Sequence, residues 1–257
     1  MLRSIASRAR QALSRYLVAV FRATERLNRD AILETLSGEK VHSLLDCGCG
    51  DGGFTLELAR QVGAERVFGV EWDSSRAEAA REKGIAAVRA DLNGPLPFDD
   101  QVFDVVHSNQ VLEHLYSTDT FLRESRRVLK PGGIVILSTN NLSSWHNVVS
   151  LILGMQPPPM HVSGEVIAGN TLDPLRGTRH PTVGDSHLRL FSFKGLRELC
   201  EYHRYTVKVL KGVGYYPLPP RLSKLATRVD RWHGAFLVAA LQRSEQVPSD
   251  SWPTAAR

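Results

Sequence analysis

One stretch, SLLDCGCGDGGF at residues 43–54, constrains the fold of this chain more than any other. A short apolar run ends in Asp46 and is followed at once by closely spaced glycines, after which residues 55–60 have helix-forming character. Glycine permits backbone dihedral angles closed to other residues, and without a side chain the main chain can lie against a ligand at a helix N-terminus. The stretch therefore predicts a strand, a glycine turn and a helix, with a nucleotide pocket at the carboxyl end of a parallel strand.

Two kinds of nucleotide compete for this loop. Gly48, Gly50 and Gly53 fit the dinucleotide pattern G-x-G-x-x-G, and Glu71 follows about 20 residues later, where that pattern places an acid for ribose hydroxyls. The carboxylate of Asp46 would repel a diphosphate beside the loop, whereas it suits a ligand with positive charges nearby. The glycine spacing alone leaves both ligands open.

The positive charge is concentrated at the N-terminus. The chain has 32 Lys and Arg against 27 Asp and Glu, a net charge of +5, and residues 1–29 hold seven arginines against one acid. Apolar residues recur every three or four positions from Leu2 to Leu27, which predicts an amphipathic helix within a basic arm at residues 1–37. Two hypotheses stay open: the helix makes a peripheral contact with an anionic membrane or a partner, or it packs on its own domain.

Cysteine usage favours a reducing compartment. Cys47 and Cys49 lie in the glycine loop with one residue between them, which is poor geometry for a disulfide, and no second Cys/His pair lies nearby for zinc. No run of 18 apolar residues predicts a membrane span, and the N-terminus lacks the apolar core of a secretory signal. We expect a cytoplasmic protein, although an Arg-rich, acid-poor start is also typical of mitochondrial transit peptides.

Polar residues follow the next two predicted strands, RVFGVEWD and IAAVRADL. Glu71, at the carboxyl end of the first, can accept hydrogen bonds from two ribose hydroxyls, and Trp72 beside it is a candidate for contact with adenine. At the end of the second, Asp91 can accept from the adenine amino group, and Leu92 supplies a backbone N–H. In an open α/β sheet these carboxyl ends border the same crevice.

A further polar cluster follows the strand predicted at Phe103–His107. Asn109 and Gln110 come directly after it, and His114 lies on the helix predicted next. Because residues just beyond this strand face the same crevice, Asn109 and Gln110 are candidates for holding the ligand. His114 is a candidate for bordering the substrate and is a second candidate catalytic residue.

Five segments, in this order and spacing, carry a family resemblance: LLDCGCGDGGF, VFGVEWD, RADL, FDVVHSNQVLEHL and ESRRVLKPGGIVILST. Together they resemble the class I S-adenosylmethionine (SAM)-dependent methyltransferases, especially the small-molecule branch that includes the ubiquinone/menaquinone-type enzymes. The resemblance covers residues 43–139. It implies a Rossmann-like α/β fold with a seven-stranded, mostly parallel sheet in the order 3-2-1-4-5-7-6, strand 7 antiparallel, and helices on both faces.

The resemblance also implies SAM as cofactor and S-adenosylhomocysteine as product. It places the cofactor contacts on the glycine loop and on the acids of the next two strands, namely Asp46, Gly48, Gly50, Glu71 and Asp91. We expect Cys49, inside the loop, to line the same site.

The chain beyond the fifth strand is assigned to acceptor binding. The predicted methyltransferase domain covers residues 38–243, its long segment 140–186 is typical of a lid or substrate loop, and residues 244–257 read as a flexible tail. For transfer to oxygen, His187 at the lid junction is the candidate general base, with His161 and His180 as alternatives. No metal ion is expected, because the sequence lacks clustered carboxylates near strands 4 and 5.

Two other functions are alternatives to methyl transfer. An NAD(P)-dependent oxidoreductase would leave Asp46 and the LKPGG segment unexplained, and the chain has no Tyr-x-x-x-Lys dyad. A non-catalytic SAM-fold binding protein would use the arginine-rich helix as its interface. No nucleic acid is expected as substrate, since HSNQ follows strand 4 where an NPPY-type motif would stand. The sequence leaves open the small-molecule acceptor, the acceptor atom and the oligomeric state.

Overall fold

The computed structural model describes residues 2–179 and 186–244. The helices are α1 (Leu2–Thr35), α2 (Gly53–Val62), α3 (Ser74–Glu82), the 3-10 helix η1 (Leu112–His114), α4 (Thr118–Val128), α5 (Trp145–Ile152), α6 (Phe193–Tyr202) and α7 (Pro220–Val229). The strands are β1 (Ser43–Cys47), β2 (Arg66–Glu71), β3 (Ala86–Arg89), β4 (Phe103–Asn109), β5 (Leu129–Asn140), β6 (Tyr205–Val213) and β7 (Phe236–Arg243).

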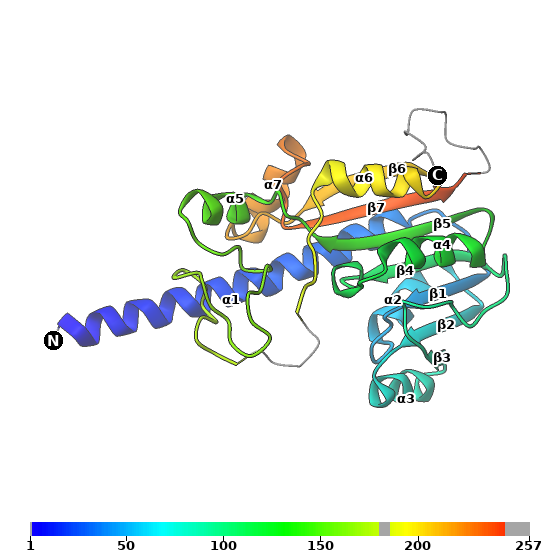
Figure 1. The fold of residues 1–257 in the computed structure, drawn as a ribbon, viewed down its shortest axis with the longest axis horizontal. Coiled ribbons are helices and arrows are strands. Elements are labelled where there is room, and N and C mark those ends of the chain that lie inside the picture. The colour runs from blue at the N-terminus through cyan, green and yellow to red at the C-terminus, as the bar shows by residue number, and fades with distance from the viewer. Residues whose placement is uncertain (1, 180–185, 245–257) are drawn as a thin grey trace, which may run out of the picture. The chain divides into compact units, whose positions relative to one another are not determined.

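The strands form one seven-stranded sheet in the order β3-β2-β1-β4-β5-β7-β6 (Figure 1). β1 pairs in parallel with β2 and β4, β2 with β3, and β4 with β5. The predicted strand order and mixed sheet are confirmed. This order places the carboxyl ends of β1, β2, β3 and β4 at the same edge, where the sequence predicts the cofactor residues.

The chain divides into two compact units, each made of discontinuous segments. Unit 1 comprises Met1–Ala31, Asn140–Phe193 and Lys211–Leu237, and unit 2 comprises Ile32–Thr139, Lys194–Leu210 and Val238–Arg257. The arm at 1–37, the domain at 38–243 and the tail at 244–257 stay predictions. All but the first residue of that tail lies outside the described residues.

The core of unit 2 lies around the central strands. All five residues of β1 are buried, as expected for a parallel strand covered on both faces. Three phenylalanines, Phe68, Phe98 and Phe103, make mutual edge-to-face contacts with ring centroids 5.1–5.9 Å apart. The hydroxyl of buried Tyr205 donates to the Leu122 carbonyl at 2.9 Å, so β6 is tied to α4.

In unit 1, the second half of α1 packs on the 211–237 segment. Thr24 is buried and lies so close to Gly214 that a Cβ at the glycine would overlap the Thr24 methyl group. The Phe21 ring lies 6.0 Å from that of Tyr216 and 6.3 Å from that of Phe236. The arm is therefore a helix as predicted, and its residues 20–31 have a packing partner within their own unit.

Residues 140–186, the segment predicted as a lid, contain a helix that the sequence did not predict. α5 has the sequence WHNVVSLI and buries its polar Asn147 and Ser150, whereas Val149 and Ile152 are exposed. The segment read as a loop because residues 140–186 form a long stretch with consecutive prolines at 157–159 and little alternation. Within residues 2–179 and 186–244, no helix is both long and apolar enough to cross a bilayer.

We predict that Leu45→Ala lowers the free energy of unfolding by about 2–5 kcal/mol, because Leu45 is fully buried in the central strand and its loss leaves a cavity. Leu13→Ala is the control, because Leu13 is exposed on α1. Chemical denaturation followed by circular dichroism measures both. Equal stabilities of Leu45→Ala and the wild type would show that β1 does not form the core.

Candidate functional site

The glycine loop after β1 adopts a conformation that only glycine accepts readily. Gly48 and Gly50 have φ angles of 83° and 56°, and the N–H groups of Gly48 and Cys49 donate to the Val70 carbonyl at 2.8 and 3.1 Å. A Cβ at Gly48 would overlap the Val111 side chain, which follows β4. The loop is thus held between the end of β2 and the segment after β4.

Glu71 links the glycine loop to the chain after β2. One carboxylate oxygen accepts the N–H of Gly50 at 2.9 Å, and the other accepts the N–H of Asp73 at 2.9 Å. A carboxylate has about four acceptor positions, so these two bonds leave capacity for ribose hydroxyls. Glu71 is therefore fixed beside the loop in a position suited to the role predicted for it.

Asp46 lies beneath the loop and is buried. One of its oxygens accepts from the Thr55 hydroxyl at 2.5 Å, and the other lies 2.7 Å from Nδ1 of His107. The ring of Phe54 meets the His107 ring edge-on at 5.6 Å. Both carboxylate oxygens are bonded inside the protein, so Asp46 positions the loop from below.

His107 is a site residue that sequence reasoning missed. It stands opposite Asp46 in the register of β1 and β4, and only 1% of it is exposed. The sequence shows a histidine among the apolar residues of FDVVHS, but only the strand register reveals that it pairs with Asp46.

The residues predicted to contact adenine lie after β2 and β3. Trp72 is 64% exposed, and the Arg89 guanidinium lies 5.5 Å from its ring centroid. Asp91 accepts from the backbone N–H and the side-chain amide of Asn93 at 2.9 and 2.8 Å, while Leu92 is largely buried. Trp72 and Asp91 are accessible, and their contact with adenine stays a prediction.

The turn after β4 has unusual backbone geometry. Gln110 has a φ of 57°, and its N–H donates to the Ser138 carbonyl on β5 at 2.9 Å. Asn109 stands opposite Ser138 in the β4–β5 register. A non-glycine residue with positive φ requires support from its surroundings, and such residues cluster at functional sites. The turn places both candidates at the carboxyl end of β4.

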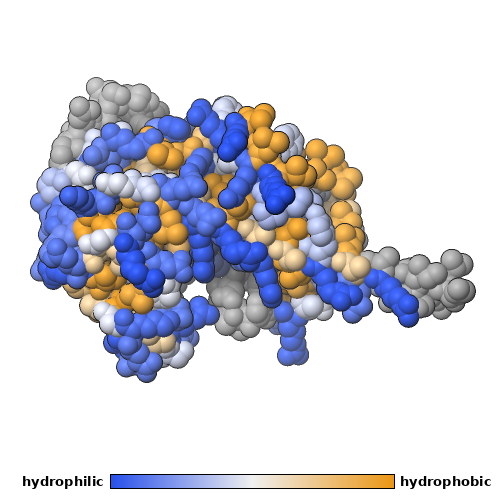
Figure 2. Space-filling model, turned by 180° about the vertical axis from the view of Figure 1, so that it is seen from behind, coloured by the Kyte–Doolittle hydropathy of each residue, from blue (hydrophilic) through white to orange (hydrophobic). Residues whose placement is uncertain are grey.

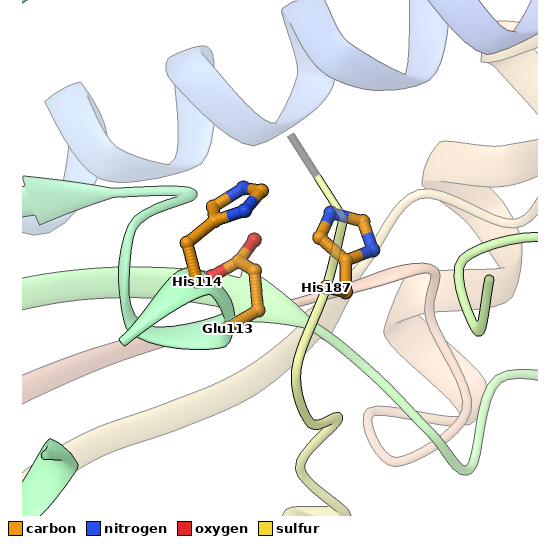
Figure 3. Close-up of side chains that lie close together, drawn as sticks. All are labelled: Glu113, His114 and His187. Carbon is orange, nitrogen blue, oxygen red and sulfur yellow. The ribbon is translucent and has the colours of Figure 1, made fainter. Parts of the chain in front are cut away.

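Glu113 and His114 lie on η1, which follows this turn (Figure 3). The Glu113 carboxylate is fully buried and accepts from the Thr139 hydroxyl at 2.8 Å. Sequence reasoning chose His114 and missed Glu113, because only the fold shows that the carboxylate points inward.

His187, also drawn in Figure 3, belongs to unit 1 and is partly buried. Its Nδ1 lies 2.6 Å from the Pro159 carbonyl oxygen, and its Nε2 lies 3.4 Å from the Asn140 amide nitrogen. A carbonyl oxygen only accepts, so Nδ1 carries the proton and Nε2 is the basic nitrogen. The His161 ring lies 5.4 Å away, and His180 lies outside the described residues.

Known proteins are similar to the part of the chain that contains the glycine loop and the strand ends described above. Residues 45–137 match a family described as a methyltransferase domain. The 2-phytyl-1,4-naphtoquinone methyltransferase of Nostoc punctiforme is 34% identical over 116 residues, which cover 42% of this chain and 50% of that protein. This domain belongs to the class I SAM-dependent methyltransferases. SAM is the cofactor of this family.

Other methyltransferases show similar matches. The sterol 4-C-methyltransferase strm-1 of Caenorhabditis elegans is 35% identical over 147 residues, covering 51% of this chain and 43% of that protein. The demethylmenaquinone methyltransferase of Staphylococcus epidermidis is 32% identical over 114 residues, covering 42% and 47%. The chain therefore spans half or less of the length of these curated relatives.

Solved structures share the fold at low sequence identity. A SAM-dependent methyltransferase of Thermotoga maritima, described as a possible histamine N-methyltransferase, aligns with a TM-score of 0.57 at 18% identity, over 90% of this chain and 97% of that one. The [4+2]-cyclase SpnF aligns with a TM-score of 0.54 at 20% identity, over 84% and 80%. These likenesses show the fold alone.

We predict that Gly48→Ala weakens SAM binding by roughly tenfold or more. The added methyl group would strain the backbone and push against Val111, which would move the loop. Gly63→Ala is the matched control, because Gly63 also has positive φ but has open space around its Cβ position. Calorimetric titration with SAM compares the two, and equal affinities would place the cofactor away from this loop.

We also predict that the three cysteines react slowly in the folded protein. Burial, with the nearby Asp46 and Glu71 carboxylates, raises the pKa of Cys49 to about 12, and burial raises that of Cys200 to about 12. Burial and Asp46 raise the pKa of Cys47 well above its usual value. At pH 8 the thiolate fraction of Cys49 and of Cys200 is about one in ten thousand, and the thiolate is the nucleophile.

Reaction with Ellman's reagent at pH 8 measures this property. Labelling should be slow in native protein and fast for all three thiols in guanidinium chloride. Rapid labelling of a thiol in native protein would contradict the burial of the loop and of α6.

Proposed function

We propose that this chain transfers the methyl group of SAM to an oxygen atom of a small lipophilic acceptor, without a metal ion. The observation that carries the proposal is the fixed Glu71 carboxylate, which accepts the Gly50 N–H beside a glycine loop that belongs to a methyltransferase domain. We propose that the loop and Glu71 hold the adenosyl group, and methyl transfer is the chemistry that fits that cofactor.

The lipophilic acceptor is supported by the relatives. Their names specify a phytyl naphthoquinone, a demethylmenaquinone and a sterol as substrates, all of them hydrophobic ring systems. We propose an acceptor of this class, with a lipid-linked glycan as the second candidate. The exposed arginines of α1, among them Arg15 and Arg22, are proposed to make a peripheral contact with the cytoplasmic surface of a membrane.

Transfer to oxygen needs removal of one proton. In the proposed step an acceptor oxygen attacks the methyl carbon in line with the sulfonium, the C–S bond breaks, and S-adenosylhomocysteine leaves. The sulfonium is already a good leaving group, so the enzyme contributes orientation, exclusion of water and a base. We propose Nε2 of His187 as that base, supported by the Nδ1–H group that donates to the Pro159 carbonyl. We propose that His114 borders the acceptor.

We predict that the protein binds SAM and S-adenosylhomocysteine but not NADH, and that Glu71→Ala abolishes measurable binding. Glu71→Gln should retain part of the affinity, since its amide oxygen still accepts a hydrogen bond. Calorimetric titration with the three nucleotides measures this. Binding of NADH alone would identify an oxidoreductase, and SAM binding without turnover of any acceptor would favour a non-catalytic binding protein.

The base is tested with hydroxylated naphthoquinols and sterols as acceptors. We predict that His187→Gln lowers kcat by about 10²–10⁴ and leaves the SAM affinity unchanged, because general base catalysis contributes about that much. His161→Gln tests the alternative base, whose ring lies 5.4 Å from that of His187, and it should keep the wild-type kcat if His187 is the base. If His187→Gln keeps the wild-type kcat and the wild-type pH profile, His187 is not the general base.

A further inference from the structure

Two helices of unit 1 bury small polar residues and expose large apolar ones. In α5 the buried residues are Asn147 and Ser150, and in α7 the buried residue is Ser223. Packing of a soluble helix normally turns the apolar face inward. The reversal in both helices indicates a surface with a partner of its own.

The buried side of α5 is held by hydrogen bonds. The Asn147 amide donates to the Asn141 carbonyl at 2.9 Å, and the Asn170 amide donates to the Ser150 hydroxyl at 3.1 Å. These bonds fix the polar face inward and leave Val149 and Ile152 on the outside, with Ile152 78% exposed.

α7 is held in the same way. The Ser223 hydroxyl accepts the Tyr215 N–H at 2.7 Å, which holds this side of α7 inward. The opposite face carries Leu225 and Val229, four positions apart, with Val229 86% exposed. Side chains at this spacing lie on one stripe of a helix.

The two helices meet at one junction. The indole N–H of Trp145, at the start of α5, donates to the Asp230 carboxylate at 3.0 Å, directly after α7. The Trp145 ring also lies 4.6 Å from the ring of His233. Figure 2 shows hydrophobic atoms gathered at the upper right of the molecule, with hydrophilic atoms beside them. We name the exposed apolar side chains of α5 and α7 the α5–α7 face; they include Trp145, Val149, Leu151, Ile152, Leu222, Leu225 and Val229.

The charge at this face is positive. Arg221, Lys224 and Arg228 are exposed on α7 beside its apolar stripe, and the helix contains no acidic residue. The nearest acid along the chain, Asp230, accepts from Trp145 and lies 2.8 Å from His233 Nδ1. Apolar side chains bordered by cations match the interface of an anionic bilayer, where cations meet headgroups and apolar side chains meet acyl chains.

We propose that the α5–α7 face docks on an anionic lipid bilayer. A second copy of the chain fits less well, because a two-fold contact would bring the cations of α7 against themselves. The docking does not depend on α1, and it does not require methyl transfer. Only one part rests on the proposed function, namely that docking brings the enzyme to its lipophilic acceptor.

The test is co-sedimentation of the full chain with vesicles of phosphatidylcholine alone and of phosphatidylcholine mixed with phosphatidylglycerol. The wild type should bind the mixed vesicles only. The double variants Leu225→Ser/Val229→Ser and Lys224→Glu/Arg228→Glu should each bind them at least roughly tenfold more weakly. These side chains are exposed, so thermal unfolding should stay unchanged.

Matched controls lie on unit 2. Tyr202→Ser removes an exposed aromatic ring from α6, and Arg60→Glu reverses an exposed cation on α2. Both should bind the mixed vesicles like the wild type. Absence of wild-type binding, or equal binding by the α7 variants and the wild type, would overturn the proposal. A dimer that the α7 variants dissociate, seen by sedimentation velocity without vesicle binding, would overturn it in favour of self-association.

Discussion

The position of the cofactor loop depends on one buried carboxylate. Asp46 ends the central strand inside the protein, where an unpaired charge would cost several kcal/mol, and its two oxygens are satisfied by Thr55 from α2 and His107 from β4. These bonds join three elements beneath the glycine loop. With the loop fixed, the Gly50 N–H reaches Glu71, and the carboxylate that is proposed to hold ribose gains a defined position.

The functions proposed for the chain fall on different units. The residues proposed to hold the cofactor all belong to unit 2, at or just after the carboxyl ends of its strands. Unit 1 holds His187 and the α5–α7 face, which are proposed to act on the acceptor and on the membrane. Such a division fits a fold whose cofactor site is a property of the sheet and whose acceptor specificity is added by segments outside it.

The features that could be predicted from the sequence are those set by short local motifs and by the family resemblance. The glycine loop and Glu71 at the end of β2 follow from local motifs, and the strand order is what the family resemblance implies. The pairing of Asp46 with His107 was missed because it depends on the register between two strands far apart in sequence. Helix α5 was missed because it is short and was read together with the long segment 140–186, although its apolar residues recur at helical spacing.

The proposed cofactor site is best tested by a crystal structure of the protein with S-adenosylhomocysteine. The ribose hydroxyls should donate to the Glu71 carboxylate, and the methionine end should pass the glycine loop at Gly48. A nucleoside bound elsewhere, or bound with no contact between its ribose and Glu71, would contradict the assignment of the cofactor site.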